Sequence, residues 1–334
     1  MMRGAVAGAA VLATFACGCN DAASAQELPR GRTEAEGVSE LAALCAGNSA
    51  DLLSPCRELA LAAMAVQRGV GLALALGSDV PGTSSTAGRR MGSVPRFGFA
   101  LAATGIGMGM PRVSARSAEG LAEEVDPTVI GLRGVVSAGL VDGFQFAPGI
   151  GGFLSADLTA SYSRLWLPEG EGFDGPSSGV GLGARVGILR ESFTTPGISV
   201  SVARRWHETV GTGDVEDGNP GELETDLEVT SLRAMLGKNW FVVGLMAGAG
   251  WDRYAGEATV SATGGVDETG AVSGRLASER TVYFVSAWYN FLISQLSAEV
   301  GVADGVSDPF DNRSAGYDPD RRHWFASVAV RVTP

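Results

Sequence analysis

The sequence predicts an all-β fold, an antiparallel transmembrane β-barrel of about 10 strands (10–12), preceded by a short helical N-terminal segment. Three observations predict it: segments in which apolar residues alternate with small or polar ones, connections that are alternately long and short, and acidic residues gathered in the long connections. The composition agrees, because the 334 residues are 45% hydrophobic, only 19% charged, and include 48 glycines.

The charge balance excludes several classes of protein. Thirty-seven acidic residues against 25 basic ones give a net charge of −12 and leave no basic face for a nucleic acid. The apolar content is too high for a disordered acidic tail. Two histidines are too few for a histidine-rich metal site. No later stretch reaches the roughly 18 unbroken apolar residues that a transmembrane helix needs.

Residues 1–25 have the pattern of a secretory signal peptide. Arg3 supplies the positive charge, an apolar run follows, and Ala23-Ser24-Ala25 forms an A-x-A cleavage site. A lipoprotein signal is the alternative, since Cys17 and Cys19 end the apolar run, but neither follows a leucine at the third position before it. The pattern therefore predicts an exported protein.

The segment 26–94 differs from the rest of the chain. Helical patterning covers 38–46 and 56–66. Cys45 and Cys56, the two cysteines left after cleavage, are predicted to form a disulfide in the oxidising exported compartment. The segment is therefore interpreted as a disulfide-stapled periplasmic cap or barrel plug.

A glycine-rich stretch, 69–77, leaves two interpretations open. Its alternation of glycine or alanine with larger apolar residues fits an extra strand, and it fits equally a plug in the lumen. An extra barrel strand would require one more, near 257–263, to keep the strand count even.

Ten segments show the period of two that a strand with two different faces requires. In 150–166, for example, Leu158 and Tyr162 share one face, and Asp157 and Ser161 share the other. Most are long enough for a tilted membrane-spanning strand, which needs about 9–11 residues, rather than a soluble sandwich strand of about 5–6. The segments are 95–106, 127–141, 150–166, 179–190, 198–207, 227–236, 240–251, 281–291, 295–303 and 321–333.

The connections between these segments are alternately long and short, as expected where one rim of a barrel has tight periplasmic turns and the other has long external loops. The long connections contain 24 acidic residues and six arginines, a net charge of −18. They are predicted as loops over 107–126, 167–178, 208–226, 252–280 and 304–320.

Side-chain types assign the two faces of the wall. Aromatic residues near strand ends predict the interfacial girdle of a barrel. Charged residues on the small-residue faces predict a charged lumen, because an arginine facing lipid at mid-depth would cost about 2–4 kcal/mol. The girdle set is Tyr162, Trp166, Trp206, Trp240, Trp251, Tyr254, Tyr289 and Trp324. The lumen set is Arg133, Asp157, Arg185, Arg205, Glu299 and Arg331.

These patterns give residues 95–334 a resemblance to bacterial outer-membrane β-barrels of the porin-like superfamily. The glycine-rich stretch 69–77 is similar to the N-terminal hatch of the long-chain fatty acid transporter family. The resemblance implies a Gram-negative outer-membrane location, contact with outer-membrane lipid and lipopolysaccharide, and transport as the activity.

No catalytic motif is found. The run Gly179-x-Gly181-x-Gly183 lies inside a predicted strand, whereas a dinucleotide site needs such glycines at a strand-to-helix turn. His207 and His323 have no serine in a recognisable catalytic setting. An enzyme is therefore not the expectation, and an outer-membrane enzyme is the third hypothesis for function.

The leading hypothesis is a narrow channel or transporter for small solutes, because a lumen enclosed by about ten strands is nearly filled by side chains. The second hypothesis is a closed barrel acting as a structural or adhesive anchor, whose acidic loops attract cations. No cofactor is expected beyond weakly bound Ca²⁺ or Mg²⁺, for which hard oxygen ligands are needed. The candidate ligands are Asp304, Asp308, Asp311, Asp318 and Asp320.

Overall fold

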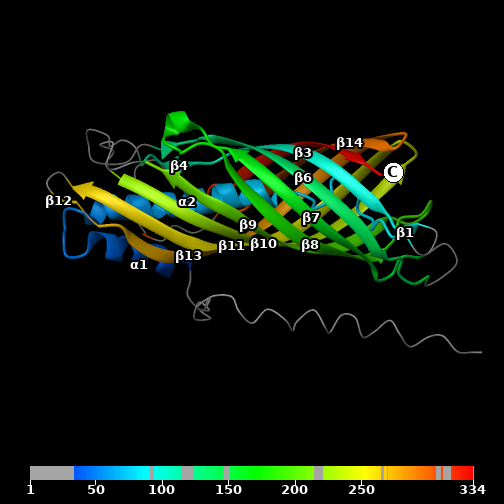
Figure 1. Cartoon of the computed structure of the whole chain (residues 1–334), viewed down its shortest axis with the longest axis horizontal. Coiled ribbons are helices and arrows are strands. Elements are labelled where there is room, and N and C mark those ends of the chain that lie inside the picture. Colours follow the sequence, from blue (N-terminus) through cyan, green and yellow to red (C-terminus); the bar gives the residue numbers. More distant parts are fainter. Residues whose placement is uncertain are drawn as a thin grey trace, which may run out of the picture. The chain divides into compact units, whose positions relative to one another are not determined.

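A computed structural model describes residues 34–90, 94–113, 124–145, 151–213, 221–264, 267–268, 270–305, 310 and 317–333. Ten long antiparallel strands close into a barrel, because β10 pairs with β9 on one side and β11 on the other, and β15 pairs with β3 (Figure 1). The strands are β3 (Phe97–Gly107), β6 (Thr128–Val141), β7 (Ser155–Trp166), β8 (Ser177–Leu189), β9 (Gly197–Thr212), β10 (Gly221–Trp240), β11 (Val243–Gly264), β13 (Val272–Phe291), β14 (Ser294–Ala303) and β15 (His323–Val332).

Short elements complete the described part of the chain. Two-residue strands pair outside the barrel ladder as β1 (Arg89–Arg90) with β2 (Val94–Pro95) and β4 (Met110–Pro111) with β5 (Glu124–Val125). β12 (Asp267–Glu268) pairs with the end of β11, and a single 3₁₀ turn covers Glu169–Glu171. The predicted barrel of ten strands is confirmed.

Two of the predicted loops are wrong. Much of 208–226 and 252–280 is strand, because β9 runs to Thr212, β10 begins at Gly221, and β11 and β13 pair with one another from Val260 and Val272. Apolar and polar residues still alternate in these stretches, but the two types have exchanged faces relative to the rest of the barrel. Acidic residues point outward here and apolar residues point inward. We call the portions 207–212, 221–229, 254–264 and 272–280 the extension.

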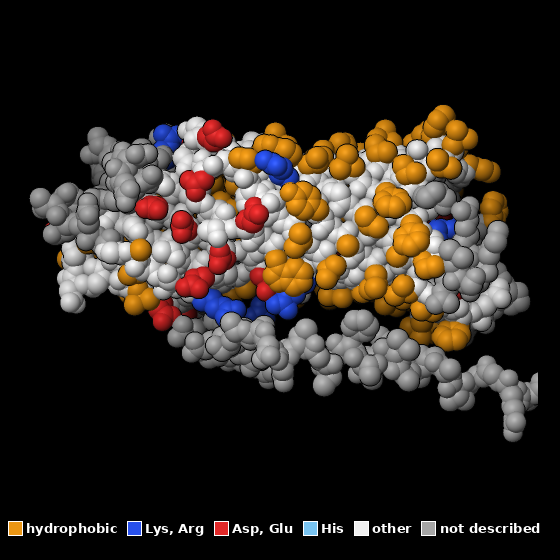
Figure 2. Space-filling model, in the orientation of Figure 1, with side chains coloured by type: hydrophobic (Ala, Val, Ile, Leu, Met, Phe, Trp, Pro, Cys, Tyr) orange, Lys and Arg blue, Asp and Glu red, His pale blue; other side chains and the backbone are white. Residues whose placement is uncertain are grey.

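Exposed apolar side chains form a belt around the rest of the barrel, which Figure 2 shows over one half of the visible face, with acidic side chains over the other half. Seven of the predicted girdle aromatics are exposed on the outer wall. Two arginines, Arg164 and Arg204, lie over the rings of Trp166 and Trp206 at 6.0 and 5.6 Å. A cation beside an interfacial aromatic marks the level of the lipid headgroups.

The prediction for Tyr254 is wrong. This side chain is fully buried inside the barrel, and its hydroxyl donates a hydrogen bond to Asp252 at 3.2 Å. The reason is the period of the strand. Trp251 faces outward, so Tyr254, three positions later, faces inward.

An inner segment, residues 34–88, occupies the lumen. It consists of α1 (Glu34–Ala46), α2 (Leu53–Ala75) and the extended stretch 76–88. α2 contacts β3, β6, β10, β11 and β13, which come from opposite sides of the wall (Figure 1). By length and composition α2 could cross a membrane, but here its most apolar window of 18 residues is buried inside the protein.

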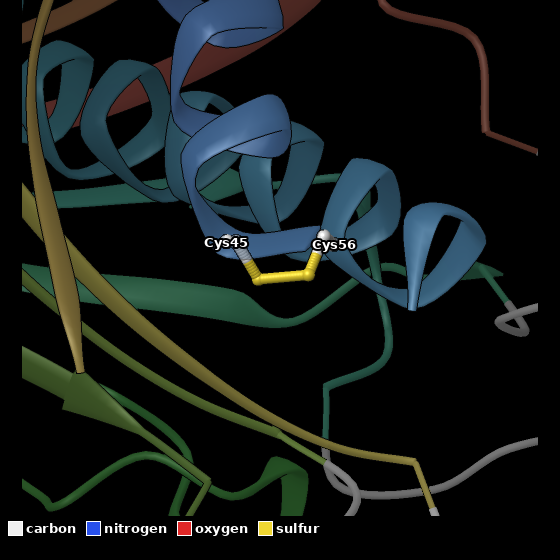
Figure 3. Close-up of a disulfide and its surroundings, with 2 residues drawn as sticks. All are labelled: Cys45 and Cys56. Carbon is white, nitrogen blue, oxygen red and sulfur yellow. A yellow bond between two sulfur atoms is a disulfide. The ribbon is translucent and has the colours of Figure 1, made fainter. Parts of the chain in front are cut away.

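The predicted disulfide is confirmed. Cys45, near the end of α1, and Cys56, in the first turns of α2, are bonded and buried, with Cα atoms 5.6 Å apart (Figure 3). The bond closes the short connection between the two helices. It thereby limits the freedom of the helical hairpin in the unfolded chain.

The stretch 69–77 is not a strand, because α2 continues to Ala75. Its glycines serve close packing of the helix against the wall. A Cβ atom at Gly69 would collide with Met108, and one at Gly71 would collide with the ring of Tyr254. The alternation of small and large residues therefore reflects contact between a helix and the barrel.

The part of the apolar core that packs α1 and the start of α2 lies inside the extension. Leu41 of α1 faces Gly274 on β13, and Leu59 of α2 faces Gly221 on β10. Inward-facing Leu223 on β10 is fully buried in the same cluster. The water outside the extension supplies the hydrophobic driving force for this packing.

Candidate functional site

The lumen within the belt is built from small residues on one side. Gly179, Gly181 and Gly183 on β8, with Ser199 and Ser201 on β9, point inward. Close approach of the inner segment occurs at Gly187 and Gly197, where an added Cβ would meet Thr86 and Ser85. The stretch 76–88 is held to the wall by polar contacts from β6, β7, β8, β9, β10 and β14.

Two arginines bind the carboxyl end of α2. Arg233 on β10 donates to the carbonyls of Ala75 (2.9 Å) and Gly77 (3.1 Å), while Arg133 on β6 donates to the carbonyl of Leu76 (3.3 Å). The last carbonyls of a helix lack intrahelical partners and carry its negative dipole end, so cations stabilise them. The sequence thus places fixed cations where the helix must stop.

Arg233 also forms the most buried ion pair of the lumen. It binds Asp252 on β11 through two nitrogens, at 2.6 and 2.9 Å, and neither side chain is exposed. A bidentate guanidinium–carboxylate pair fixes geometry as well as charge. The pair therefore orients Arg233 toward the end of α2.

Asp79 is the main anionic contact of the stretch 76–88. Its carboxylate accepts hydrogen bonds from Arg205 and Ser201 on β9, and all three residues are buried. Arg205 also donates to Ser231 on β10 at 2.7 Å. One carboxylate of the inner segment is in this way tied to two strands of the wall.

Two wall carboxylates bind the backbone of the inner segment. Asp157 on β7 accepts from the N–H of Ala87 at 2.9 and 3.0 Å and pairs with Arg185 on β8 at 2.7 Å. Glu299 on β14 accepts from the N–H of Ser78 at 3.3 Å. Gly77 is required beside it, because its φ is +59° and a Cβ there would overlap the Glu299 carboxylate.

All six residues of the sequence-predicted lumen set face the interior. Five of them contact the inner segment or one another. Arg331 on β15 makes no hydrogen bond or ion pair with any residue that the structure describes. The set is Arg133, Asp157, Arg185, Arg205, Glu299 and Arg331.

Three central residues were not predicted. Arg233 lies on a strand whose inward face is also apolar at Val229 and Met235, so apolar character did not identify the outer face. Asp252 lies in the predicted loop 252–280, and Asp79 lies in the segment 26–94, for which the sequence predicts no charged contact. The sequence does contain a signal for Arg233. Leu232 and Leu236 lie an even number of positions apart and share the lipid-facing side of the strand, so Arg233, next to Leu232, faces the interior.

A second charged group lies inside the extension, where α1 packs against α2. Glu34 is 3.8 Å from Arg68, and both side chains are largely buried. Burial raises the pKa of Glu34 to about 7, an effect that nearby Arg68 and Arg280 partly offset. This carboxylate is consequently the titratable contact of the helical hairpin near neutral pH.

The predicted cation ligands do not come together in the described residues. Asp304 lies 3.5 Å from Arg322, and Asp318 accepts from the N–H of Asp320. Asp308 and Asp311 lie outside the described residues. Within the described ranges no three acidic, cysteine or histidine side chains form a metal-binding group, so cation binding stays a prediction.

His207 does contact a serine, but in the wrong arrangement for a nucleophile. Its Nδ1 lies 2.9 Å from the carbonyl of Glu208 and 3.2 Å from Oγ of Ser177. A carbonyl only accepts, so Nδ1 carries the proton and cannot take one from the serine. His323 has its Nδ1 3.3 Å from the carbonyl of Gly107.

No protein-family model matches the chain, and no curated protein matches it. Solved structures that are similar include the translocator domain of the autotransporter NalP from Neisseria meningitidis, at 10% identity and a TM-score of 0.38, covering 71% of this chain and 87% of that one. An outer-membrane channel from Pseudomonas putida F1 is similar at 10% identity and a TM-score of 0.35, covering 76% and 99%. The outer-membrane protease OmpT from Escherichia coli is similar at 9% identity and a TM-score of 0.33, covering 72% and 96%.

The geometry places the chain in a class of membrane proteins. A closed barrel satisfies every backbone group within its ladder, which is what a β-structure in lipid requires. The exposed apolar belt with its aromatic residues then matches the lipid-facing band of such barrels. The chain has the fold of a transmembrane β-barrel, the fold of outer-membrane-type barrels.

Proposed function

We propose that this protein is an outer-membrane channel for small solutes whose inner segment acts as a plug. One observation carries the proposal: the wall is lined by glycine and serine on β8 and β9, and the space is filled by residues 76–88. A barrel serving only as an anchor can fill its lumen with its own large side chains. Here β8 and β9 leave room that residues 76–88 occupy, while larger inward side chains such as Phe284 and Trp288 on β13 line another part of the lumen.

The contacts that hold the plug within the belt are of an exchangeable kind. Asp79, Ser78 and Ala87 are bound to the wall by hydrogen bonds and ion pairs. Water can replace polar contacts of this kind when the lumen becomes hydrated, whereas leaving an apolar core exposes surface to water at high cost. The stretch 76–88 is therefore the part of the plug expected to move first.

The composition of the wall predicts the selectivity of the open lumen. Within the belt, the described inward charges are five arginines and three carboxylates, so that removal of Asp79 with the plug leaves an excess of positive charge. Charged constrictions select permeants of opposite sign. Anions are the expected permeants. The wall residues are Arg133, Arg185, Arg205, Arg233, Arg331, Asp157, Asp252 and Glu299.

Planar-bilayer conductance tests the proposal. We expect the full mature protein to be closed, Asp79→Asn to open in brief steps, and a protein lacking residues 26–92 to give steady steps. A reversal potential in a salt gradient should show anion preference. Arg204→Gln is the matched control, because its partner Glu228 lies on the outer wall. Silence from a truncated protein that folds, as shown by its heat-dependent migration on a gel, would contradict the channel.

The extension favours a second candidate, an anchor. It raises a wall with outward Glu222, Glu224, Asp226 and Glu228 beyond the lipid belt. Such a surface attracts Ca²⁺ or Mg²⁺ and partners of positive charge. The same conductance experiment separates the two, since an anchor stays silent with and without its inner segment.

A further inference from the structure

A small cavity lies at the short-turn end of the lumen, between the inner segment and the wall. Its volume is about 120 Å³, which is the room of about four waters at ~30 Å³ each. Thr83 and Thr86 of the inner segment line it on one side, and Arg185 and Arg331 of the wall line it on the other. Arg96 also lines it and is exposed, so the cavity reaches solvent there.

The cavity holds more positive charge than its surroundings neutralise. Arg185 is 1% exposed and shares the Asp157 carboxylate with the N–H of Ala87. Neither Arg331 nor Arg96 has an ion pair with a described residue. Three guanidinium groups therefore meet a single carboxylate.

Specific donors also point to a missing acceptor. The Nε–H groups of Arg185 and Arg331 are buried and donate to no acceptor among the described residues. A buried donor without an acceptor costs free energy, and an uncompensated buried charge costs more. Water would satisfy the N–H groups but would leave the charge unbalanced.

We propose that this cavity is a binding site for a small oxyanion, of the class of phosphate, sulfate or a carboxylate. Guanidinium groups bind such anions through paired N–H donors. The hydroxyl groups of Ser137 and Thr333, which also line the cavity, supply further hydrogen bonds. The site does not require the plug to move, so it stands independently of the channel proposal.

The direction of entry follows from the topology. Short turns of such barrels lie on the periplasmic side, and Arg96 precedes β3 at that rim. Two sources can supply the oxyanion: free inorganic phosphate in the periplasm, or the phosphate of a lipid headgroup in the inner leaflet. A bound oxyanion would join β15 and β8 to the stretch 83–87.

The test uses the full mature protein in a phosphate-free neutral detergent. Sodium phosphate is titrated against sodium chloride at matched ionic strength, and the melting temperature is followed by loss of β-structure. We expect a saturable rise with phosphate that chloride does not give. Vesicles of phosphatidylglycerol without free phosphate form the second arm, and stabilisation by that lipid alone assigns the site to a headgroup phosphate.

Two variants of Arg331 make the test specific. Arg331→Met should raise the melting temperature in phosphate-free buffer, because it removes an uncompensated charge, and should weaken phosphate binding at least tenfold. Arg331→Lys should keep weaker binding. Arg204→Met, on the outer wall, should leave phosphate binding unchanged. The proposal is overturned if neither phosphate nor the lipid stabilises the protein more than chloride, or if Arg331→Met binds phosphate as the native protein does.

Discussion

The extension and the belt are two parts of one barrel. The polar face of the wall is outside in the extension and inside in the belt. In the extension, Glu224 faces outward and Leu223 is buried inside, whereas in the belt of the same strand Leu236 faces outward and Arg233 is buried inside. Both parts share the strand β10 and its pairing partners β9 and β11. What changes is the medium outside the wall, which is water in one part and lipid in the other.

The difference teaches where a membrane barrel can have a hydrophobic core. Burying leucine inside the extension removes it from water and stabilises the fold. Inside the belt, the outer face is already in an apolar medium, and the interior is held by ion pairs and by hydrogen bonds to residues 76–88. The helices α1 and α2 lie against the apolar part, and the extended stretch lies against the polar part.

Removal of Arg233 should give the largest loss of stability, because buried ion pairs stabilise the interior of the belt. Arg233→Met leaves the Asp252 carboxylate buried without its partner and removes the donors to Ala75. A loss of about 3–5 kcal/mol in the free energy of unfolding is expected. The measurement is urea unfolding of the protein in lipid vesicles.

Arg204→Met is the matched control for this loss. Arg204 pairs with Glu228 at 2.7 Å, but both side chains are substantially exposed on the outer wall. Exposed pairs contribute about 1 kcal/mol or less. Equal losses for the two variants would mean that burial in the lumen does not determine what a pair contributes.

Truncation of Leu223 tests the core of the extension. Leu223→Ala should cost about 2–5 kcal/mol, because it opens a cavity among buried side chains. Leu236→Ala, on the lipid face of the same strand, should cost less, since lipid chains fill the space. A larger loss for Leu236→Ala would place the main apolar packing outside the barrel, and paired urea titrations give both values.

An added charge should locate the boundary between the two parts. Leu236→Arg is expected to cost about 2–4 kcal/mol, because position 236 faces lipid. Glu224→Arg should change stability by about 0.5 kcal/mol or less, since position 224 faces water. The ratio of folded to unfolded protein in vesicles reports both effects. A large loss of stability for Glu224→Arg would show that the lipid-facing belt reaches position 224.

The same exchange of polar and apolar faces explains which features of the fold can be predicted from the sequence. Period-two alternation gave all ten strands and the inward placement of Arg185 and Arg205, since alternation depends only on the backbone. The strand ends in the extension are not predicted, because their outward acidic residues have the composition of loops. The partners of the inner segment could not be predicted, because Asp79 meets Arg205 only through the closure of the barrel.

The stretch 69–77 has the alternating pattern of a strand although most of it is helical, for a related reason. Gly69 and Gly71 alternate with larger residues as they would in a strand, but they are small because Met108 and Tyr254 approach the helix there. Local pattern carries no information about which wall residue will stand opposite. Contacts between segments distant in the chain decided both the helix and the site.

A pH-dependent effect is expected from Glu34, a largely buried carboxylate of the helical hairpin that titrates near neutral pH. The pKa of Glu34 is raised from 4.5 to about 7 because burial disfavours its charged form more than Arg68 and Arg280 favour it, and Glu279 adds to the rise. The folded protein therefore binds a proton more tightly than the unfolded chain does. Stability is highest below about pH 4.5 and falls as the pH rises toward 7, by at most about 3 kcal/mol.

Glu34→Gln should remove this slope, because glutamine cannot be charged. Unfolding free energies of the native protein and the variant, measured between pH 5 and 8, should therefore diverge as the pH rises, with the variant more stable at pH 8. Parallel curves would show that Glu34 is as well solvated as in the unfolded chain. The contrast with Asp252 is the point of the experiment: the belt interior provides a buried carboxylate with a bidentate partner at 2.6 Å, whereas the extension offers Glu34 an arginine only at 3.8 Å. A charge is thus expected to stabilise the polar half of the lumen and to destabilise the apolar half.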